Sequence, residues 1–366
     1  MLKNDLNKLK ASVETYILEN LSKDISGHNG PYRDKETPIR YKAHMICFLC
    51  NTDPEIRYKE QVKLLVAQIL SSDYNLQNGF FINRFKEGKD QVNGVIGIAW
   101  IIEAFSLATI KYNFDETKDY LHQVEEKIPF IQTRALWQGP VNNHPTGWKT
   151  DNNFNHQLWL AYSLILKSKA LNIDVSTNVK LFFSKINHNL NVRKSGLIAH
   201  SIRNESKFKG ILKDVRDRIK GLLLGKTKNY KENGYHLFNL FAFARIKQEG
   251  FSYLFENNLL FQKALRYCNN ELLHNSLNNN HEETDFYYLS PPSNLRYNRY
   301  GIHYNVSGLE YLVIKSIFNL EDCKGGNDLI KNQISCYDLN IIENSMSEDI
   351  VNFILRTYEL TYLNKC

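Results

Sequence analysis

Four stretches of the chain begin with amide or tyrosine side chains and then stay apolar for about three or four helical turns. They are Asn93–Ile110, Asn152–Ile165, Tyr235–Ile246 and Tyr304–Phe318. A helix that is apolar on nearly every side is buried among other helices, so the polar groups of its first turn must be satisfied by one another or by a bound molecule. The sequence therefore predicts an inner ring of helices with a polar opening.

Helical periodicity extends over most of the chain. The predicted helices are residues 2–21, 38–49, 57–70, 91–112, 115–128, 152–171, 178–187, 209–224, 234–247, 251–267, 306–318 and 347–362. Alternating strand patterns are nearly absent, although residues 287–304 allow short strands. This pattern predicts an all-α protein.

The first two polar-headed stretches begin 59 residues apart and the last two 69 residues apart, and a repeat of about sixty residues holds one helical hairpin with its loop. Repeated hairpins stack because none of them buries its apolar face alone, and a chain of 366 residues holds about six. We expect an (α/α)6 toroid, with an inner and an outer ring of helices. No Gly-, Pro- or Ser-rich linker interrupts the chain, so residues 1–366 are predicted to form a single domain.

Composition narrows the class of protein. A hydrophobic content of 43% is ample for a large core and excludes disorder. The N-terminus alternates charged and apolar residues, and the longest apolar stretch, Val95–Ile102, ends at Glu103, before membrane-spanning length. We expect a cytoplasmic protein without membrane insertion. The net charge of +7 is spread along the chain and suits any anionic ligand.

No motif predicts a metal or a cofactor. The six cysteines form no framework, and Cys47 and Cys50 lie in an apolar run without a second pair, so buried free thiols are expected. Phosphate-loop, dinucleotide-binding and nucleophile-elbow motifs are absent, as are histidine pairs at metal-binding spacing.

Asp90 and Asp151 are the first candidate catalytic residues, because each precedes a predicted inner helix and they lie one repeat apart. Neighbouring helix axes are roughly 8–10 Å apart, so both carboxylates are expected to face one pocket. Paired carboxylates carry out glycosidic acid and base chemistry when crowding raises the pKa of one of them. The competing interpretation is that both aspartates only cap helices. His156, one turn beyond Asp151, is the third candidate.

Further polar and aromatic residues lie in or beside the loops that precede inner helices, where function concentrates on a rigid scaffold. Imidazoles bind sugar hydroxyls, aromatic rings stack on sugars, and guanidinium groups grip carboxylates. The candidate substrate-binding residues are Arg40, His44, Trp148, His200, His236, Arg299, His303 and Tyr304. Core packing and surface solvation are the competing roles.

The Gly88-Lys89-Asp90 loop and the segment from Asp151 through Asn152, Asn153 and Phe154 to a Leu-Trp-Leu-Ala run resemble the six-hairpin glycosidase superfamily. Within it, the chain looks most like the unsaturated glucuronyl hydrolases and related glycosidases of surface-glycan clusters. The resemblance implies that Asp151 is the general acid and base, with Asp90 as its partner. It also implies protonation of the enol-ether double bond of an unsaturated uronic acid, followed by addition of water. The expected partner is therefore an oligosaccharide or polysaccharide, not a nucleic acid.

Two alternatives remain open. A polysaccharide lyase or uronyl C5-epimerase on the same scaffold would use Tyr304, His303, His156 and Arg299 to abstract a proton beside a neutralised carboxylate. A non-catalytic helical-repeat scaffold would present a continuous basic or apolar concave face.

Overall fold

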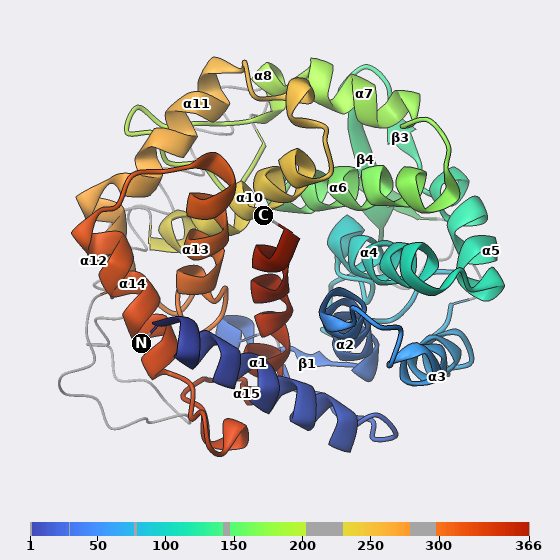
Figure 1. The fold of residues 1–366 in the computed structure, drawn as a ribbon. Helices are drawn as coiled ribbons and strands as arrows, with labels where there is room; N and C mark the ends of the chain where they lie inside the picture. The colour runs from blue at the N-terminus through green and yellow to red at the C-terminus, as the bar shows by residue number, and fades with distance from the viewer. Residues whose placement is uncertain are drawn as a thin grey trace.

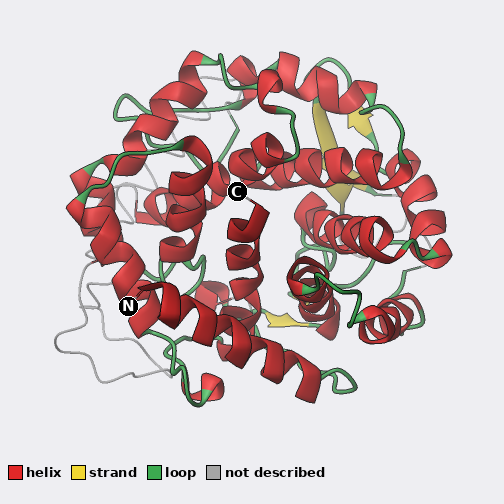
Figure 2. Ribbon diagram, viewed as in Figure 1, coloured by secondary structure: helices red, strands yellow, loops and turns green. Residues whose placement is uncertain are grey.

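The computed structural model describes residues 2–28, 30–76, 79–141, 147–202, 230–278 and 298–365. Across these ranges the chain is mostly helical, as the sequence predicts (Figure 2). The predicted helix 209–224, the candidate strands at 287–297 and Cys366 lie outside them.

Within the described residues, a series of helical segments contact one another in chain order and the last returns to the first (Figure 1). They are α2 (Pro38–Thr52), α4 (Gly94–Tyr112), α6 (Phe154–Leu171), α10 (Tyr230–Gln248), α13 (Ser307–Phe318) and the C-terminal pair α15 (Ile350–Leu355) and η6 (Arg356–Lys365). We call these the inner helices. Four of them correspond to the polar-headed apolar stretches. These four lie inside because a helix that is apolar all round is stable only when other helices surround it.

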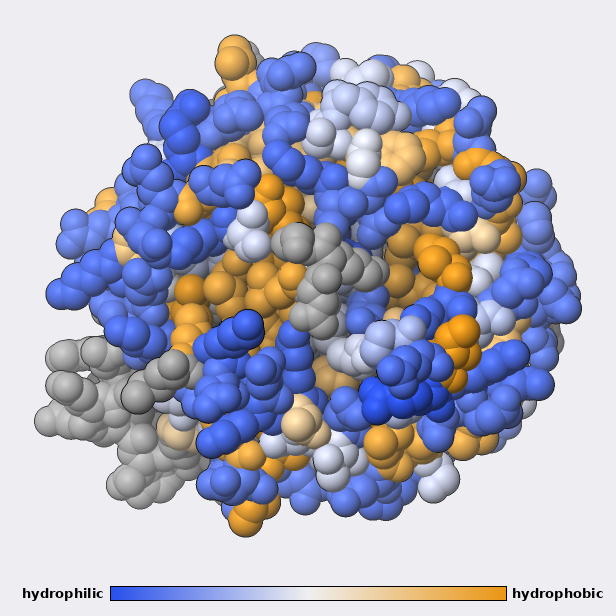
Figure 3. All heavy atoms as spheres, in the orientation of Figure 1, coloured by the Kyte–Doolittle hydropathy of each residue, from blue (hydrophilic) through white to orange (hydrophobic). Residues whose placement is uncertain are grey.

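The remaining longer helices cover the inner ones and have a single buried stripe. They are α1 (Leu2–Glu19), α3 (Lys59–Leu70), α5 (Asp115–Val124), α7 (Thr177–Ser184), α11 (Leu259–Arg266), α12 (Glu271–Asn278) and α14 (Lys324–Ser335). Helix α3 packs on α2, α5 on α4, α7 on α6, α12 on α10 and α14 on α13. On the face shown in Figure 3, hydrophilic residues cover much of the surface, and apolar ones show near the centre and at scattered places around the edge.

In the part of the chain that the structure describes, two small antiparallel sheets connect the helices. Strand β1 (Lys35–Glu36) pairs with β2 (Arg84–Phe85), and β3 (Phe130–Ile131), β4 (Leu136–Pro140) and β5 (Trp148–Thr150) form a second sheet in that order. In the second sheet Gln138 lies opposite Thr150. These strands were not predicted from the sequence, because they are too short to show alternation. Strand β5 ends immediately before Asp151.

Several predicted helix boundaries were wrong. Residues 178–187 divide into α7 and α8 (Ile186–Asn189), and residues 251–267 contain the short η3 (Ser252–Leu254) followed by α11. The second break has a clear cause, because the side chain of Asn258 accepts hydrogen bonds from the first amides of α11 and starts a new helix. Helices α12 and α14 were not predicted.

Helix α4 is long and apolar enough to span a membrane, but 83% of that stretch is buried inside the protein. It packs between α2 and α6. These are the properties of a core helix. Of the described cysteines, Cys47, Cys50, Cys268 and Cys336 are buried and Cys323 is partly exposed, and none of them forms a disulfide.

Candidate functional site

The inner helices begin at one end of the molecule, as contacts between their first residues show. Asp151, before α6, binds the first turn of α4. Asn305, before α13, donates a hydrogen bond to the carbonyl of Gly234 in α10. Asp349, at the start of α15, accepts one from Tyr41 of α2. We call this the N-terminal end of the inner helices. Because helix N-termini attract negative charge, it suits carboxylates and anionic ligands.

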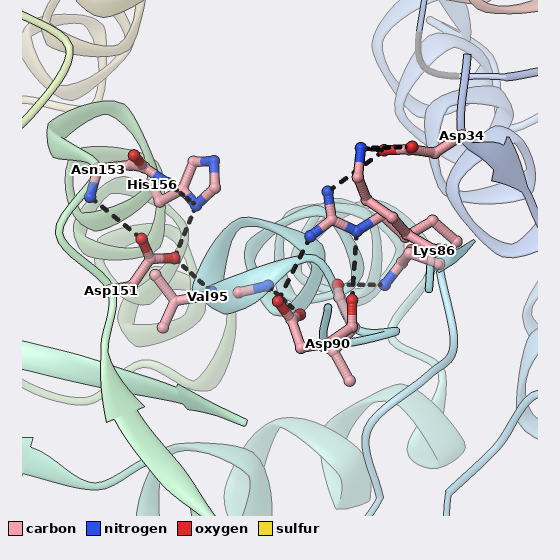
Figure 4. A network of polar contacts seen from close by, with 11 residues as sticks. Asp34, Lys86, Asp90, Val95, Asp151, Asn153 and His156 are labelled. Carbon is pink, nitrogen blue, oxygen red and sulfur yellow. Dashed lines mark hydrogen bonds and ion pairs between the residues drawn. The ribbon is translucent and has the colours of Figure 1, made fainter. Parts of the chain in front are cut away.

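Asp90 and Asp151 meet at the start of α4 (Figure 4). The Oδ1 atom of Asp90 accepts a hydrogen bond from the Gly94 amide at 2.6 Å, and the Oδ2 atom of Asp151 accepts one from the Val95 amide at 3.1 Å. The two carboxylates therefore bind adjacent amides of one helix. The two carboxylates therefore lie close together, and Asp151 binds an amide of the neighbouring helix α4 and does not cap α6, the helix that it precedes.

His156 completes a pair with Asp151. Its Nδ1 atom lies 2.7 Å from Oδ2 of Asp151, and Oδ1 of Asp151 accepts a hydrogen bond from the Asn153 amide at 3.1 Å. Burial acts to raise the pKa of Asp151, but His156 and the backbone amides outweigh it and lower that pKa below its usual value. Asp151 is therefore an ionised carboxylate, and it does not have the raised pKa that crowding could produce. The second ring nitrogen of His156 points away from Asp151 (Figure 4).

Gly94 makes this arrangement possible. Its φ is +62°, and a Cβ atom there would lie 2.1 Å from Oδ2 of Asp151 and 3.1 Å from Nδ1 of His156. A side chain at this position would therefore displace the carboxylate. The close approach explains why glycine follows Asn93 at the start of an otherwise apolar helix.

Asp90 also belongs to an ion-pair network that the sequence analysis missed. Arg84 Nη2 lies 3.4 Å from Oδ2 of Asp90, and Arg84 Nη1 lies 3.9 Å from Asp34. Asp34 in turn accepts a hydrogen bond from Lys86 at 2.6 Å (Figure 4). Pairing of β1 with β2 brings Asp34 close to Arg84 and Lys86, so this network depends on strands that the sequence did not reveal.

A second group of carboxylates lies at the starts of α2 and α15. Arg40 binds both oxygens of Glu36, at 2.9 and 3.0 Å, and the hydroxyl of Tyr41 lies 2.8 Å from Glu36 and 3.3 Å from Asp349. Burial, and then the charge of Glu36, raises the pKa of Asp349 to about 6. Asp349 precedes an apolar helix just as Asp90 and Asp151 do. It was missed because the predicted helix began at Ser347.

Two predicted binding residues, Arg40 and His44, lie on buried α2. The guanidinium of Arg40 lies over the Trp100 ring at 4.3 Å, and the His44 ring stacks on Tyr358 at 4.8 Å. Both ring nitrogens of His44 are buried and have no hydrogen-bond partner among the described residues. Burial holds the pKa of His44 well below its usual value, so its imidazole is neutral.

Aromatic residues from three segments form a cluster at the same end. The ring of Tyr235 lies 5.7 Å from that of Tyr300, 6.3 Å from that of Tyr304 and 4.9 Å from that of His200. The carbonyl of His200 accepts a hydrogen bond from the amide of Phe154, the first residue of α6. The cluster therefore adjoins the segment that carries Asp151 and His156.

A buried cation lies among the inner helices. Arg356 donates hydrogen bonds to Glu310 at 2.9 Å, to Glu359 at 2.9 Å and to the side chain of Asn305 at 3.0 Å. Burial raises the pKa of Glu359 to about 7 and the pKa of Glu310 well above its usual value. In the sequence, Arg356, Glu359 and Glu310 each stand within an apolar stretch. This pattern was not used to predict buried ion pairs.

The other predicted binding residues contact residues of the same chain in the structure. His236 is fully buried, with Nδ1 accepting from the Ile198 amide and Nε2 bonded to the Ala264 carbonyl, so it has a packing role. For the rest, the partners are the Met346 carbonyl for His303, Glu348 for Arg299 and the Phe80 ring for Trp148.

Comparison with known proteins identifies a relative. No family model matches the chain. Over 262 residues, covering 67% of this chain and 70% of the relative, the chain is 30% identical to archaeal glycosylation protein Q of Haloferax volcanii. The name of that protein connects it with glycosylation, which makes a glycan-related role the coarse functional assignment. The chain belongs to the family of archaeal glycosylation protein Q.

Proposed function

We propose that the protein is a glycoside hydrolase that acts on an acidic glycan, and that its inner and outer helices form an (α/α)6 toroid with the active site at the N-terminal end of the inner helices. The carrying observation is the meeting of Asp90, Asp151 and His156 at the start of α4. The glycosylation-related relative supports a glycan as the substrate.

In this mechanism Asp151 and His156 act as one unit. The ionised carboxylate of Asp151 holds the Nδ1 proton of His156, so the other ring nitrogen carries the exchangeable proton. With an unsaturated uronic acid, protonated His156 would donate that proton to the enol-ether double bond and then take one from the attacking water. The pair would end in its starting state. Asp90, ion-paired with Arg84, would place negative charge beside the cationic transition state.

The test is a panel of saturated and unsaturated uronate oligosaccharides incubated with wild type and with Asp151→Asn. Loss of the ultraviolet absorbance of the conjugated uronate reports the reaction. We expect the substitution to lower kcat by roughly 10²–10⁴-fold, the range of acid and base catalysis, because Asn keeps an acceptor for Val95 but not the charge.

The matched control is Asp53→Asn. The carboxylate of Asp53 likewise accepts two backbone hydrogen bonds, from Arg57 and Tyr58, but it lies at the other end of α2. Its replacement should lower stability and leave kcat unchanged. Equal activity of wild type and Asp151→Asn would remove Asp151 from the mechanism.

A second candidate function is a uronate lyase or epimerase, favoured by the orientation of His156. Asp151 holds one ring nitrogen, so the nitrogen that points away is positioned to abstract a proton, with Tyr304 in the neighbouring tyrosine cluster as the acid. The same assay separates the reactions, since a lyase produces ultraviolet absorbance and a hydrolase of unsaturated uronates removes it. No absorbance change, with inversion at C5, would indicate an epimerase.

A further inference from the structure

We propose that Arg40 and His44 form the subsite that binds an acidic sugar, Arg40 through the carboxylate and His44 through a hydroxyl. We call these two residues the α2 subsite. The inference rests on the proposed function in taking an acidic glycan as the ligand, and it adds the groups that recognise the acid.

The α2 subsite lies within the first two turns of two packed inner helices, α2 and α4 (Figure 1). Arg40 and His44 are one turn apart on α2, and both contact Trp100 of α4. The guanidinium lies over the indole ring at 4.3 Å, and the imidazole meets that ring edge-on, with the centres 5.9 Å apart. The first turn of α4 binds Asp90 and Asp151, so the subsite and the proposed catalytic residues share one helix.

Arg40 has a hydrogen-bonding edge that the ion pair with Glu36 does not use. Both hydrogen bonds to Glu36 come from Nη1. The Nε atom is buried and has no hydrogen-bond partner among the described residues. In a guanidinium, N–H groups of Nε and Nη2 point the same way and form a fork that binds a carboxylate through two parallel hydrogen bonds. Stacking on Trp100 uses the face of the guanidinium and leaves this edge for a ligand.

Arg356 is the contrasting case, a buried arginine whose donors are satisfied. Its Nε atom donates to Glu359, Nη1 to the side chain of Asn305 and Nη2 to Glu310. A buried donor without an acceptor costs free energy, so native structures pair nearly all such groups. A ligand carboxylate would supply the acceptor that Nε of Arg40 lacks in the described residues.

His44 presents a second unsatisfied group to the same indole. It is 2% exposed, and both ring nitrogens are buried without a hydrogen-bond partner in the described part of the chain. Burial, and then the charges of Arg40 and Arg356, hold its pKa well below the usual value, so the ring is neutral. A neutral imidazole has one donor and one acceptor, as a sugar hydroxyl has, whereas a carboxylate only accepts. His44 therefore suits a hydroxyl and Arg40 the carboxylate.

The experiment measures binding by calorimetry in the Asp151→Asn background, which removes the proposed catalytic carboxylate. The ligands are a uronate disaccharide and its methyl ester, which keeps the hydroxyls and lacks the charge. Arg40→Lys keeps a cation for Glu36 and removes the fork. We expect it to weaken binding of the uronate by roughly 10-fold, the value of a charge-assisted hydrogen bond, and binding of the ester by less than about twofold. His44→Phe should weaken both ligands alike by roughly fivefold, the value of a neutral hydrogen bond.

His236→Phe is the matched control. Both nitrogens of His236 are bonded to backbone, so its replacement should lower the temperature of unfolding and leave both affinities unchanged. His44→Phe should unfold at the same temperature as its parent or higher, because the nitrogens that it removes have no partner among the described residues. A loss of affinity in His44→Phe would then not come from unfolding.

The outcomes separate the subsite from the hydrolase. Equal weakening of the acid and the ester by Arg40→Lys, or no weakening of either, overturns the subsite. Unchanged affinity in His44→Phe also overturns it, as does a parent protein that binds no uronate. Full turnover by Asp151→Asn would contradict the hydrolase, while the different responses of acid and ester in the two variants would still support the subsite.

Discussion

Asp90 and Asp151 bind consecutive amides of one helix, Asp90 at Gly94 and Asp151 at Val95. The two aspartates are separated by one hairpin of the chain, yet they converge on the first turn of α4. The start of α4 thus holds two carboxylates, and one of them also holds His156. Four predictions follow from this site and from the polar groups buried around it.

Gly94→Ala should destabilise the protein and disturb Asp151. The new Cβ atom would lie 2.1 Å from the carboxylate, in addition to the strain of a positive φ. The strain alone costs about 1 kcal/mol. Gly88→Ala is the control, because Gly88 has a φ of +67° and nothing within 4 Å of its Cβ position. Urea unfolding should show the larger loss for Gly94→Ala. Equal losses would mean that the carboxylate moves aside freely.

Asp349 and Asp151 should give stability opposite dependences on pH. The pKa of Asp349 is raised from 3.8 to about 6 in the folded protein, so its contribution is complete below about pH 4 and is lost as the pH rises through 6. The pKa of Asp151 is lowered, so its contribution is present above about pH 4 and is lost as the pH falls.

Unfolding free energies measured from pH 3 to pH 7 test these two opposite pH dependences. Asp349→Asn should reduce the fall in unfolding free energy between pH 4 and pH 6. The reduction is at most about 3 kcal/mol, because one pKa unit corresponds to about 1.4 kcal/mol. Asp151→Asn should instead lower stability at the neutral end. A decline between pH 4 and pH 6 that survives in Asp349→Asn would assign it to another group.

Arg356→Met should be strongly destabilising. It leaves Glu310 and Glu359 buried without their shared cation, and breaking a buried pair in this way costs about 3–5 kcal/mol. Adding Glu359→Gln should recover part of the loss, because one buried carboxylate is removed. Lys315→Met is the control, since its partner Asp322 is 73% exposed and surface pairs contribute under about 1 kcal/mol. Similar losses for both single variants would contradict the role of burial.

His44→Phe should preserve or raise stability by about 1 kcal/mol. Both nitrogens of His44 lack a partner among the described residues, so its burial carries an uncompensated desolvation cost. Phe keeps the ring stacked on Tyr358. His236→Phe is the contrast and should cost about 1–3 kcal/mol, because both nitrogens of His236 are bonded to backbone. An equal loss in the two variants, measured by thermal unfolding, would show that His44 has a buried polar partner.

The apolar pattern of the sequence was enough to predict the inner helices α4, α6, α10 and α13 and the mostly helical class, because it reports burial along a single helix. Shorter features were harder to predict. Strands β1 and β2 have two residues each, so pairing between distant segments, and not local pattern, forms them.

For the candidate site, the sequence alone determined which residue types precede the inner helices, and Asp90, Asp151 and His156 were found from that pattern. Only the tertiary structure decided that Asp151 binds the neighbouring helix α4, that Asp349 lies beside Glu36, and that Arg40 lies over the Trp100 ring. The physical reason is that a carboxylate's pKa and a cation's surroundings depend on groups brought close by packing between segments, whereas the apolar period is a property of the chain itself.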